Sequence, residues 1–224
     1  MANIKAQAQG LNPVVVGEGD YGFVSMSKIG QLFTADWQTK LVLAGKAFTL
    51  DLGAGGTGLT GNSAIDADQP EVLVAVDSGY LIPMEVNIDI YVDDCDAYDD
   101  VVDIDFIADR SQAQSTATAT AETANNLLDG AGAFGGRCWS IVSGNITAPV
   151  ESDILCSMHY ELTQVGTETA GNSHGVLGLH KVFSVPRFLA GPCQIIGYVT
   201  GTNTPTFMGS VIFAHIPSSW ISIS

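Results

Sequence analysis

The chain has 224 residues, 46% of them hydrophobic and 14% charged, and its 24 acidic residues outnumber its 8 lysines and arginines. This composition indicates a folded chain of one domain rather than a disordered one. A net charge of −16 leaves too few cations to neutralise a run of phosphates, which argues against nucleic-acid binding by the folded body. We expect neither a membrane span nor an export signal, because no apolar run is long enough and the first ten residues are polar.

Residues 1–10 are expected to form a mobile arm ahead of a single domain over residues 11–224. Beyond the arm, short runs alternate apolar and polar residues, or are wholly apolar, between turn residues, which is typical of strands. In Ile82–Val92 the apolar residues from Met84 onward occupy every second position, so they are expected to share one face. The expected strands are Tyr21–Ser27, Lys40–Leu50, Glu71–Val76, Ile82–Val92, Val101–Ile107, Cys138–Asn145, Asp153–Gln164, Val176–Val185, Gln194–Thr200 and Thr206–Ile216.

Two long segments, Gly53–Gln69 and Ala108–Gly136, are predicted to be loops between these strands. The string Gly53–Gly58 matches G-x-G-x-x-G, but no helical pattern follows it, so a loop tip is predicted instead of a dinucleotide site. Short helices are expected at Ser25–Thr34 and Ser115–Leu128, the second weakened by alternating threonines. About eight to ten antiparallel strands with little helix predict an all-β sandwich or barrel, and a jelly roll suits their number.

The densest chemical signal is a group of aspartates between two predicted strands: Asp93, Asp94, Asp96, Asp99 and Asp100. Several carboxylates within one turn supply the oxygens that Ca²⁺ prefers, and a cation would relieve their mutual repulsion. The spacing is not that of an EF-hand, because the turn glycine and the terminal glutamate are missing. The group is therefore interpreted either as a structural calcium site or as a solvated acidic hairpin.

Four widely spaced cysteines form no C-x-x-C pair and are expected to be free, buried thiols rather than zinc ligands or disulfides: Cys95, Cys138, Cys156 and Cys193. The catalytic motif H-E-x-x-H and a P-loop do not occur. His159 with Glu161 is the one close pair that a cupin-like metal enzyme would use. The chain is accordingly predicted not to be an enzyme and to need no cofactor, apart from the calcium considered above.

The strands of the C-terminal third, within Val182–Phe188, Gly191–Thr200 and Pro205–Pro217, run almost to the end of the chain. The central segment Pro70–Ile88 has the same character: a strand, a glycine-containing turn and a second strand in which a proline stands near the start. In strand order, turn placement and composition, residues 40–216 resemble the single jelly-roll capsid proteins of tailless icosahedral viruses of bacteria or archaea.

This resemblance implies a structural protein of a virion, assembled in the host cytoplasm, whose partners are further copies of itself and other virion proteins. Coat proteins that package single-stranded RNA directly often carry a basic arm, whereas residues 1–10 offer only Lys5. The genome would then be held by something else, and a decoration or spike protein fits the acidity as well as a coat subunit does.

Four aromatic residues near loops and chain ends are expected at contacts between subunits, because desolvated aromatics contribute much of an interface's energy: Phe134, Trp139, Phe188 and Trp220. Packing within the subunit's own core is their alternative role, above all for Trp139. A second functional class also stays open, a carbohydrate- or receptor-binding jelly roll whose aspartate group binds Ca²⁺.

Overall fold

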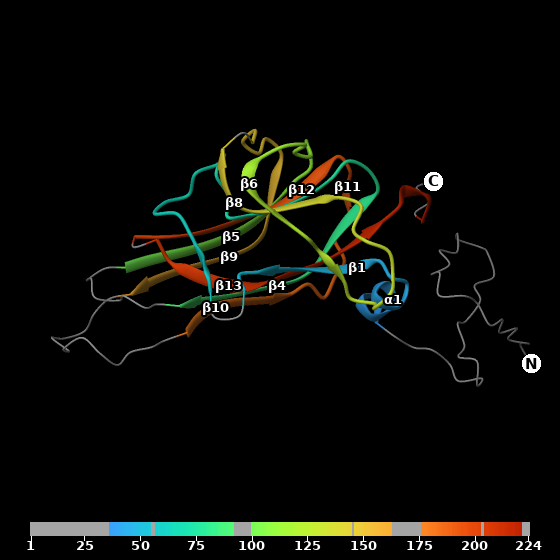
Figure 1. The fold of residues 1–224 in the computed structure, drawn as a ribbon, viewed down its shortest axis with the longest axis horizontal. Coiled ribbons are helices and arrows are strands. Elements are labelled where there is room, and N and C mark those ends of the chain that lie inside the picture. Colours follow the sequence, from blue (N-terminus) through green and yellow to red (C-terminus); the bar gives the residue numbers. More distant parts are fainter. Residues whose placement is uncertain are drawn as a thin grey trace, which may run out of the picture.

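The computed structural model describes residues 36–54, 57–91, 100–144, 146–162, 176–202 and 204–220. Of the described residues, 56% lie in strands and 6% in helices. All the strand pairs within the two sheets are antiparallel. The two sheets lie one above the other (Figure 1). The predicted all-β sandwich is confirmed.

The strand order of each sheet is read from its hydrogen bonds. The seven-stranded sheet runs β10 (Val176–Val182), β4 (Tyr80–Tyr91), β13 (Thr206–Ile216), β1 (Ala47–Leu52) and β7 (Asn125–Asn126), with β11 (Leu189–Ala190) beside β4 and β2 (Leu59–Thr60) beside β13. The six-stranded sheet runs β6 (Thr118–Glu122), β8 (Arg137–Gly144), β3 (Val72–Val76), β12 (Cys193–Gly201), β5 (Asp100–Asp109) and β9 (Ser152–Leu162). Strands β9 and β10 therefore form one edge of each sheet, and β6 and β7 form the opposite edges.

The eight main strands pair in a nested order. Taken along the chain as β1, β3, β4, β5, β9, β10, β12 and β13, the first pairs with the last, the second with the seventh, the third with the sixth and the fourth with the fifth. Further pairing of β13 with β4, and of β12 with β5, joins these four strand pairs into the two sheets. Residues 110–151, which contain β6, β7 and β8, form an insert between β5 and β9.

The main core lies between the sheets and takes alternate residues of each strand, such as Val86, Ile88 and Ile90 of β4. Met84 was expected on this face but packs on the other side of the sheet. The register of β4 against β13 shifts between Ile212 and Phe213, so Met84 is an extra residue that reverses the alternation.

The outer faces of the two sheets are covered differently. On the six-stranded sheet, residues of the insert, among them Ala113, Ala117 and Ile146, pack over β3 and β12 and enclose a second cluster. Every residue of β3 and β12 is consequently buried. On the seven-stranded sheet, the cover that the described residues provide is α1 (Trp37–Leu43) and the 3-10 turn η1 (Ser218–Trp220), at one end.

Two further sequence predictions are wrong. Lys40–Leu50 was expected to be one strand, but its first four residues belong to α1, which begins after Asp36 because the Asp36 carboxylate accepts a hydrogen bond from the backbone N–H of Thr39 (2.7 Å). The helix expected at Ser115–Leu128 is replaced by β6 and β7, since the β-branched threonines favour pairing with β8 and the backbone partners are non-local.

Predictions for residues 1–35, namely the mobile arm, the strand Tyr21–Ser27 and the helix Ser25–Thr34, lie outside the described residues. Within the described ranges, no helix is long and apolar enough to cross a membrane.

Candidate functional site

The predicted calcium site falls almost wholly outside the described residues. Asp93, Asp94, Asp96 and Asp99 belong to the segment that is not described, and Asp100 is placed only as the first residue of β5. Within the described part of the chain, no group of three or more His, Cys, Asp or Glu side chains could hold a metal ion. The calcium site at residues 93–100 remains a prediction.

Trp139 and Phe134 pack inside the chain. Trp139, in β8, is 8% exposed and lies in the cluster beneath the insert, which is the alternative role that the sequence left open. Phe134 is half-buried, and its ring centroid lies 5.3 Å from that of Phe48 and 5.0 Å from that of Phe213. These contacts hold the insert against the seven-stranded sheet.

Phe188 and Trp220 lie closer to the surface. Phe188 is 48% exposed and meets the ring of Tyr80 edge-on at 6.2 Å. Trp220 packs against the cluster under α1, with the Lys46 ammonium 5.4 Å from its ring centroid. Of the four aromatic residues expected at an interface, Phe188 is the most exposed.

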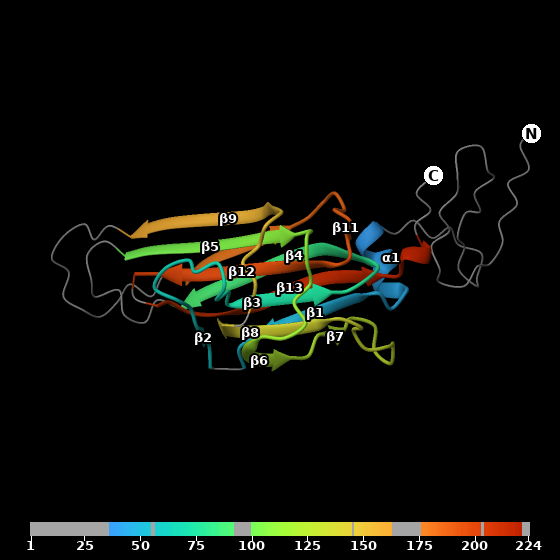
Figure 2. The ribbon, with the colours of Figure 1, turned by 90° about the horizontal axis from the view of Figure 1, so that it is seen from above.

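Phe188 belongs to a larger exposed apolar surface. Five of the seven exposed large hydrophobic residues in the described part of the chain lie near the start of β9 or between β10 and β11: Val150, Ile154, Val182, Val185 and Phe188. The two segments touch, because Arg187 Nη1 donates a 3.4 Å hydrogen bond to the carbonyl oxygen of Ile154. Figure 2 shows β9 starting beside the segment that leads to β11. We call these five residues the β9–β10 corner.

Cations accompany the corner in a chain that is otherwise strongly acidic. Arg110 pairs with Asp153 at 3.2 Å. Lys181 and Arg187 are exposed, and among the described residues neither has a carboxylate within 4 Å. Sequence reasoning missed the corner because Val150 and Ile154 come together with residues 182–188 only in the fold.

The opposite edge of the sandwich has the opposite charge. Leu127, just after β7, is exposed and is followed by exposed Asp129, while Glu122 ends β6. No Lys or Arg occurs between Arg110 and Arg137. The β6–β7 edge, defined here as residues 118–129, is therefore acidic with one exposed leucine.

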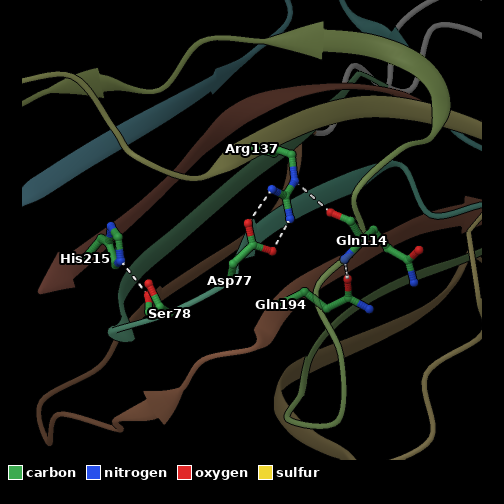
Figure 3. Close-up of polar contacts among 6 residues, drawn as sticks. All are labelled: Asp77, Ser78, Gln114, Arg137, Gln194 and His215. Atoms are coloured by element: carbon green, nitrogen blue, oxygen red, sulfur yellow. Dashed lines mark hydrogen bonds and ion pairs between the residues drawn. The ribbon is translucent and has the colours of Figure 1, made fainter. Parts of the chain in front are cut away.

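A polar network fastens the insert to the end of the six-stranded sheet (Figure 3). The Arg137 guanidinium makes two hydrogen bonds to the Asp77 carboxylate (2.6 and 2.7 Å), and its Nε donates to the Gln114 carbonyl oxygen (2.8 Å). Gln114 N–H donates to the side-chain oxygen of Gln194, whose Nε2 donates to Asp109 (3.1 Å each). The start of the insert is thus tied to β12, β5 and the end of β3.

Asp109 is the buried charge of this network, with no exposed surface. Burial raises its pKa, but hydrogen bonds from Ser111, Gln112 and Gln194 outweigh that effect and leave the pKa below its usual value. Asp77 likewise has a lowered pKa, chiefly because of its hydrogen bonds with Arg137. Hydrogen-bond partners keep both carboxylates in their charged form. A general acid would need the protonated form, so we interpret both groups as structural.

Glu71, the residue just before β3, holds the preceding loop against β12 through its carboxylate. Its carboxylate accepts hydrogen bonds from the backbone N–H of Asn62 (3.1 Å) and of Val199 in β12 (2.9 Å). The residue is 2% exposed and faces no cation there, so burial raises its pKa to about 7 despite the hydrogen bonds. Glu71 is a buried proton-binding group that the sequence did not single out.

The histidines of the described residues do not converge. His159 contacts Asp103 (2.5 Å) on the six-stranded sheet, whereas His180 contacts Glu85 (3.0 Å) on the seven-stranded sheet. His215 Nε2 lies 2.9 Å from the carbonyl oxygen of Ser78 (Figure 3), at a hollow of about 540 Å³ beside α1. The Glu161 side chain lies outside the described residues, so the pairing of His159 with Glu161 that a metal enzyme would use remains a prediction.

Three of the four cysteines are described. Cys138, Cys156 and Cys193 are buried and free, as expected, and burial raises the pKa of their thiols to about 12, 11 and 12. Such thiols are protonated at neutral pH and are poor nucleophiles or metal ligands. Cys95 lies outside the described residues.

Comparison with known proteins gives no match, whether among protein-family models, curated proteins or solved structures. The functional interpretation therefore rests on the geometry of the chain itself.

Proposed function

We propose that this protein is a virion structural protein, a capsid or coat subunit that assembles with copies of itself, and that its sandwich is a jelly roll. The nested pairing of the eight main strands supports the proposal most directly. Eight antiparallel strands in two packed sheets, connected as two Greek keys, are the architecture of viral capsid jelly rolls, although lectins and cupins use it too.

The surface favours assembly over a soluble binding role. An exposed apolar group such as the β9–β10 corner marks an interaction site, and it holds five of the seven large hydrophobic residues that are exposed in the described part of the chain. Seven of the fifteen residues that line the hollow beside α1 are glycine or alanine, and Phe48 is the one Phe, Tyr or Trp among them, so the hollow offers little aromatic surface to bury a small ligand. Contact with another protein is the use that such a surface supports.

The acidity of the chain fits a subunit whose association depends on its surroundings. With a net charge of −16, copies repel one another at low salt, and salt screens that repulsion. Calcium at residues 93–100 would act in the same direction. A decoration or spike protein, which attaches to a lattice made by another protein, is the alternative within the same class.

The size distribution of the purified chain tests the proposal. We expect light scattering and negative-stain electron microscopy to show defined oligomers or shells that form with rising salt or with Ca²⁺, and that a chelator reverses any Ca²⁺ effect. A monodisperse monomer in all these conditions, up to millimolar concentration, would contradict a self-assembling coat subunit. Specific binding to a glycan array by that monomer would favour the carbohydrate-binding alternative.

A further inference from the structure

We infer that the β9–β10 corner of one copy docks on the β6–β7 edge of a second copy, in a head-to-tail contact. The inference rests on the proposed function and names the surface through which the subunits associate. Its basis is the sorting of exposed apolar residues and charges between two opposite edges of the sandwich.

The corner has the composition of an interface centre. Val150, Ile154 and Val185 are each at least 70% exposed, and Phe188 adds a half-exposed ring. The corner is also held in shape, because Trp37 Nε1 of α1 donates to the Ser184 carbonyl oxygen (3.0 Å) and restrains the segment between β10 and β11. A rigid apolar surface loses little conformational entropy on binding.

The cations at the corner identify the partner's chemistry. Of the other described cations, Arg137 and Arg110 pair with aspartates of the chain, Lys46 lies over the Trp220 ring, and Lys40 is exposed on α1, away from the corner residues. No carboxylate of the described residues lies within 4 Å of Lys181 or Arg187. These two cations therefore indicate that the partner supplies carboxylates. The chain itself supplies acidic surface in excess, so a second copy is the partner that these charges fit.

The β6–β7 edge offers the matching surface. Leu127 supplies an apolar contact and Asp129 an exposed carboxylate, with no lysine or arginine in residues 111–136 to oppose Arg187. Strand order places this edge opposite the corner in both sheets. A contact between opposite edges leaves each copy free to repeat it with the next, which generates a closed ring or an open filament.

A two-fold contact of the corner with itself is disfavoured. It would set Arg110, Lys181 and Arg187 of each copy against those of the other, with only Glu151 and Asp153 beside them, and a surface with an excess of cations opposes its own copy. Addition of strands across the edges is disfavoured as well, because β9 carries a bulge at Leu155 and β6 and β7 are short. Side chains, not backbone ladders, make the proposed contact.

Charge exchange tests the contact in the full-length chain. We expect R187E and D129R each to weaken self-association by about tenfold or more, and the double variant R187E/D129R to recover it. R187E/D68R has the same net charge but places its new arginine on an exposed loop outside the β6–β7 edge, so it should not recover association. Recovery by both double variants, or by neither, would overturn the inference.

Cross-linking separates this inference from the proposed function. V185C and L127C chains are mixed and treated with a short bismaleimide, with the unsubstituted chain as the background for its own cysteines. We expect V185C–L127C products to exceed V185C–V185C products. Particles that form without the mixed product contradict the edge contact alone. The mixed product without particles supports the contact and contradicts the coat subunit, and the absence of both particles and mixed product contradicts both.

Discussion

The outer faces of the two sheets are covered to different extents, and β4 shows the difference within one strand. Every residue of β3 and β12 is buried, because the insert covers the outer face of the six-stranded sheet. In β4, Ile82 and Met84 are buried in the cluster beneath α1, whereas from Glu85 to Ile90 buried residues alternate with half-buried ones. The pattern in a strand thus reports whether its outer face is covered, though not by which segment.

The largest effect on stability is expected when Trp139, which packs between the six-stranded sheet and the insert, is replaced. We expect Trp139→Ala to lower the free energy of unfolding by about 3–5 kcal/mol, because it leaves a cavity between β8 and the insert. Chemical denaturation measures the change. A loss below about 1 kcal/mol would mean that the insert is not packed on the sheet, and the contrast between the two outer faces would fail.

Buried Glu71, just before β3, should make the protein less stable as the pH rises from about 4.5 to about 7. Its pKa in the folded chain, about 7, lies above the ordinary value of 4.5, so the folded state binds a proton more tightly than the unfolded state between these values. The unfolding free energy should therefore decrease from about pH 4.5 to about pH 7, by about 3 kcal/mol at most, and level off above.

Thermal melting as a function of pH, in the native chain and in Glu71→Gln, measures this effect. The variant has no charge at this position and should lose the decrease that Glu71 causes. An unchanged pH profile in the variant would assign the decrease to other carboxyl groups.

The polar network should matter less than the packing of Trp139. We expect Asp109→Asn to lower the unfolding free energy by about 1–3 kcal/mol, because the donors of Ser111, Gln112 and buried Gln194 lose a buried, charged acceptor. Asp153→Asn is the matched control, since its partly exposed pair with Arg110 contributes only about 0–1 kcal/mol. Equal losses in urea unfolding would contradict the fastening role of Asp109.

The smallest effect on stability is expected at the corner. Phe188→Ala should change the unfolding free energy by no more than about 0.5 kcal/mol, as for an exposed position. Sedimentation velocity should nevertheless show weaker self-association of this variant. A large loss of stability, or association equal to that of the native chain, would assign Phe188 to the core of its own subunit.

The strands were largely predictable from the sequence, because their local patterns suffice. The continuous apolar run of β3 and the alternation of β4 identify both strands. Helix α1 was missed, since seven residues with one capping carboxylate at Asp36 give a weak signal. The segment of β6 was expected to be a weak helix despite its threonines, because its partner β8 lies some 20 residues away and pairing in a sheet is non-local.

The candidate surface was predictable only in part. Phe188 was expected at an interface and is exposed, whereas Trp139 packs beneath the insert. Arg187 and Ile154 are 33 residues apart and meet only after β9 and β10 have taken their places in separate sheets. No local pattern in the sequence reports such a meeting.

Amide hydrogen exchange, compared between the assembled and the dissociated protein, tests most directly the claim that this chain assembles through its two edges. We predict slower exchange on assembly in residues 150–154 and 182–188 and in residues 125–129, with little change in β3 and β12, which are buried in every copy. Slower exchange confined to other surfaces, or no change at any concentration, would contradict the account.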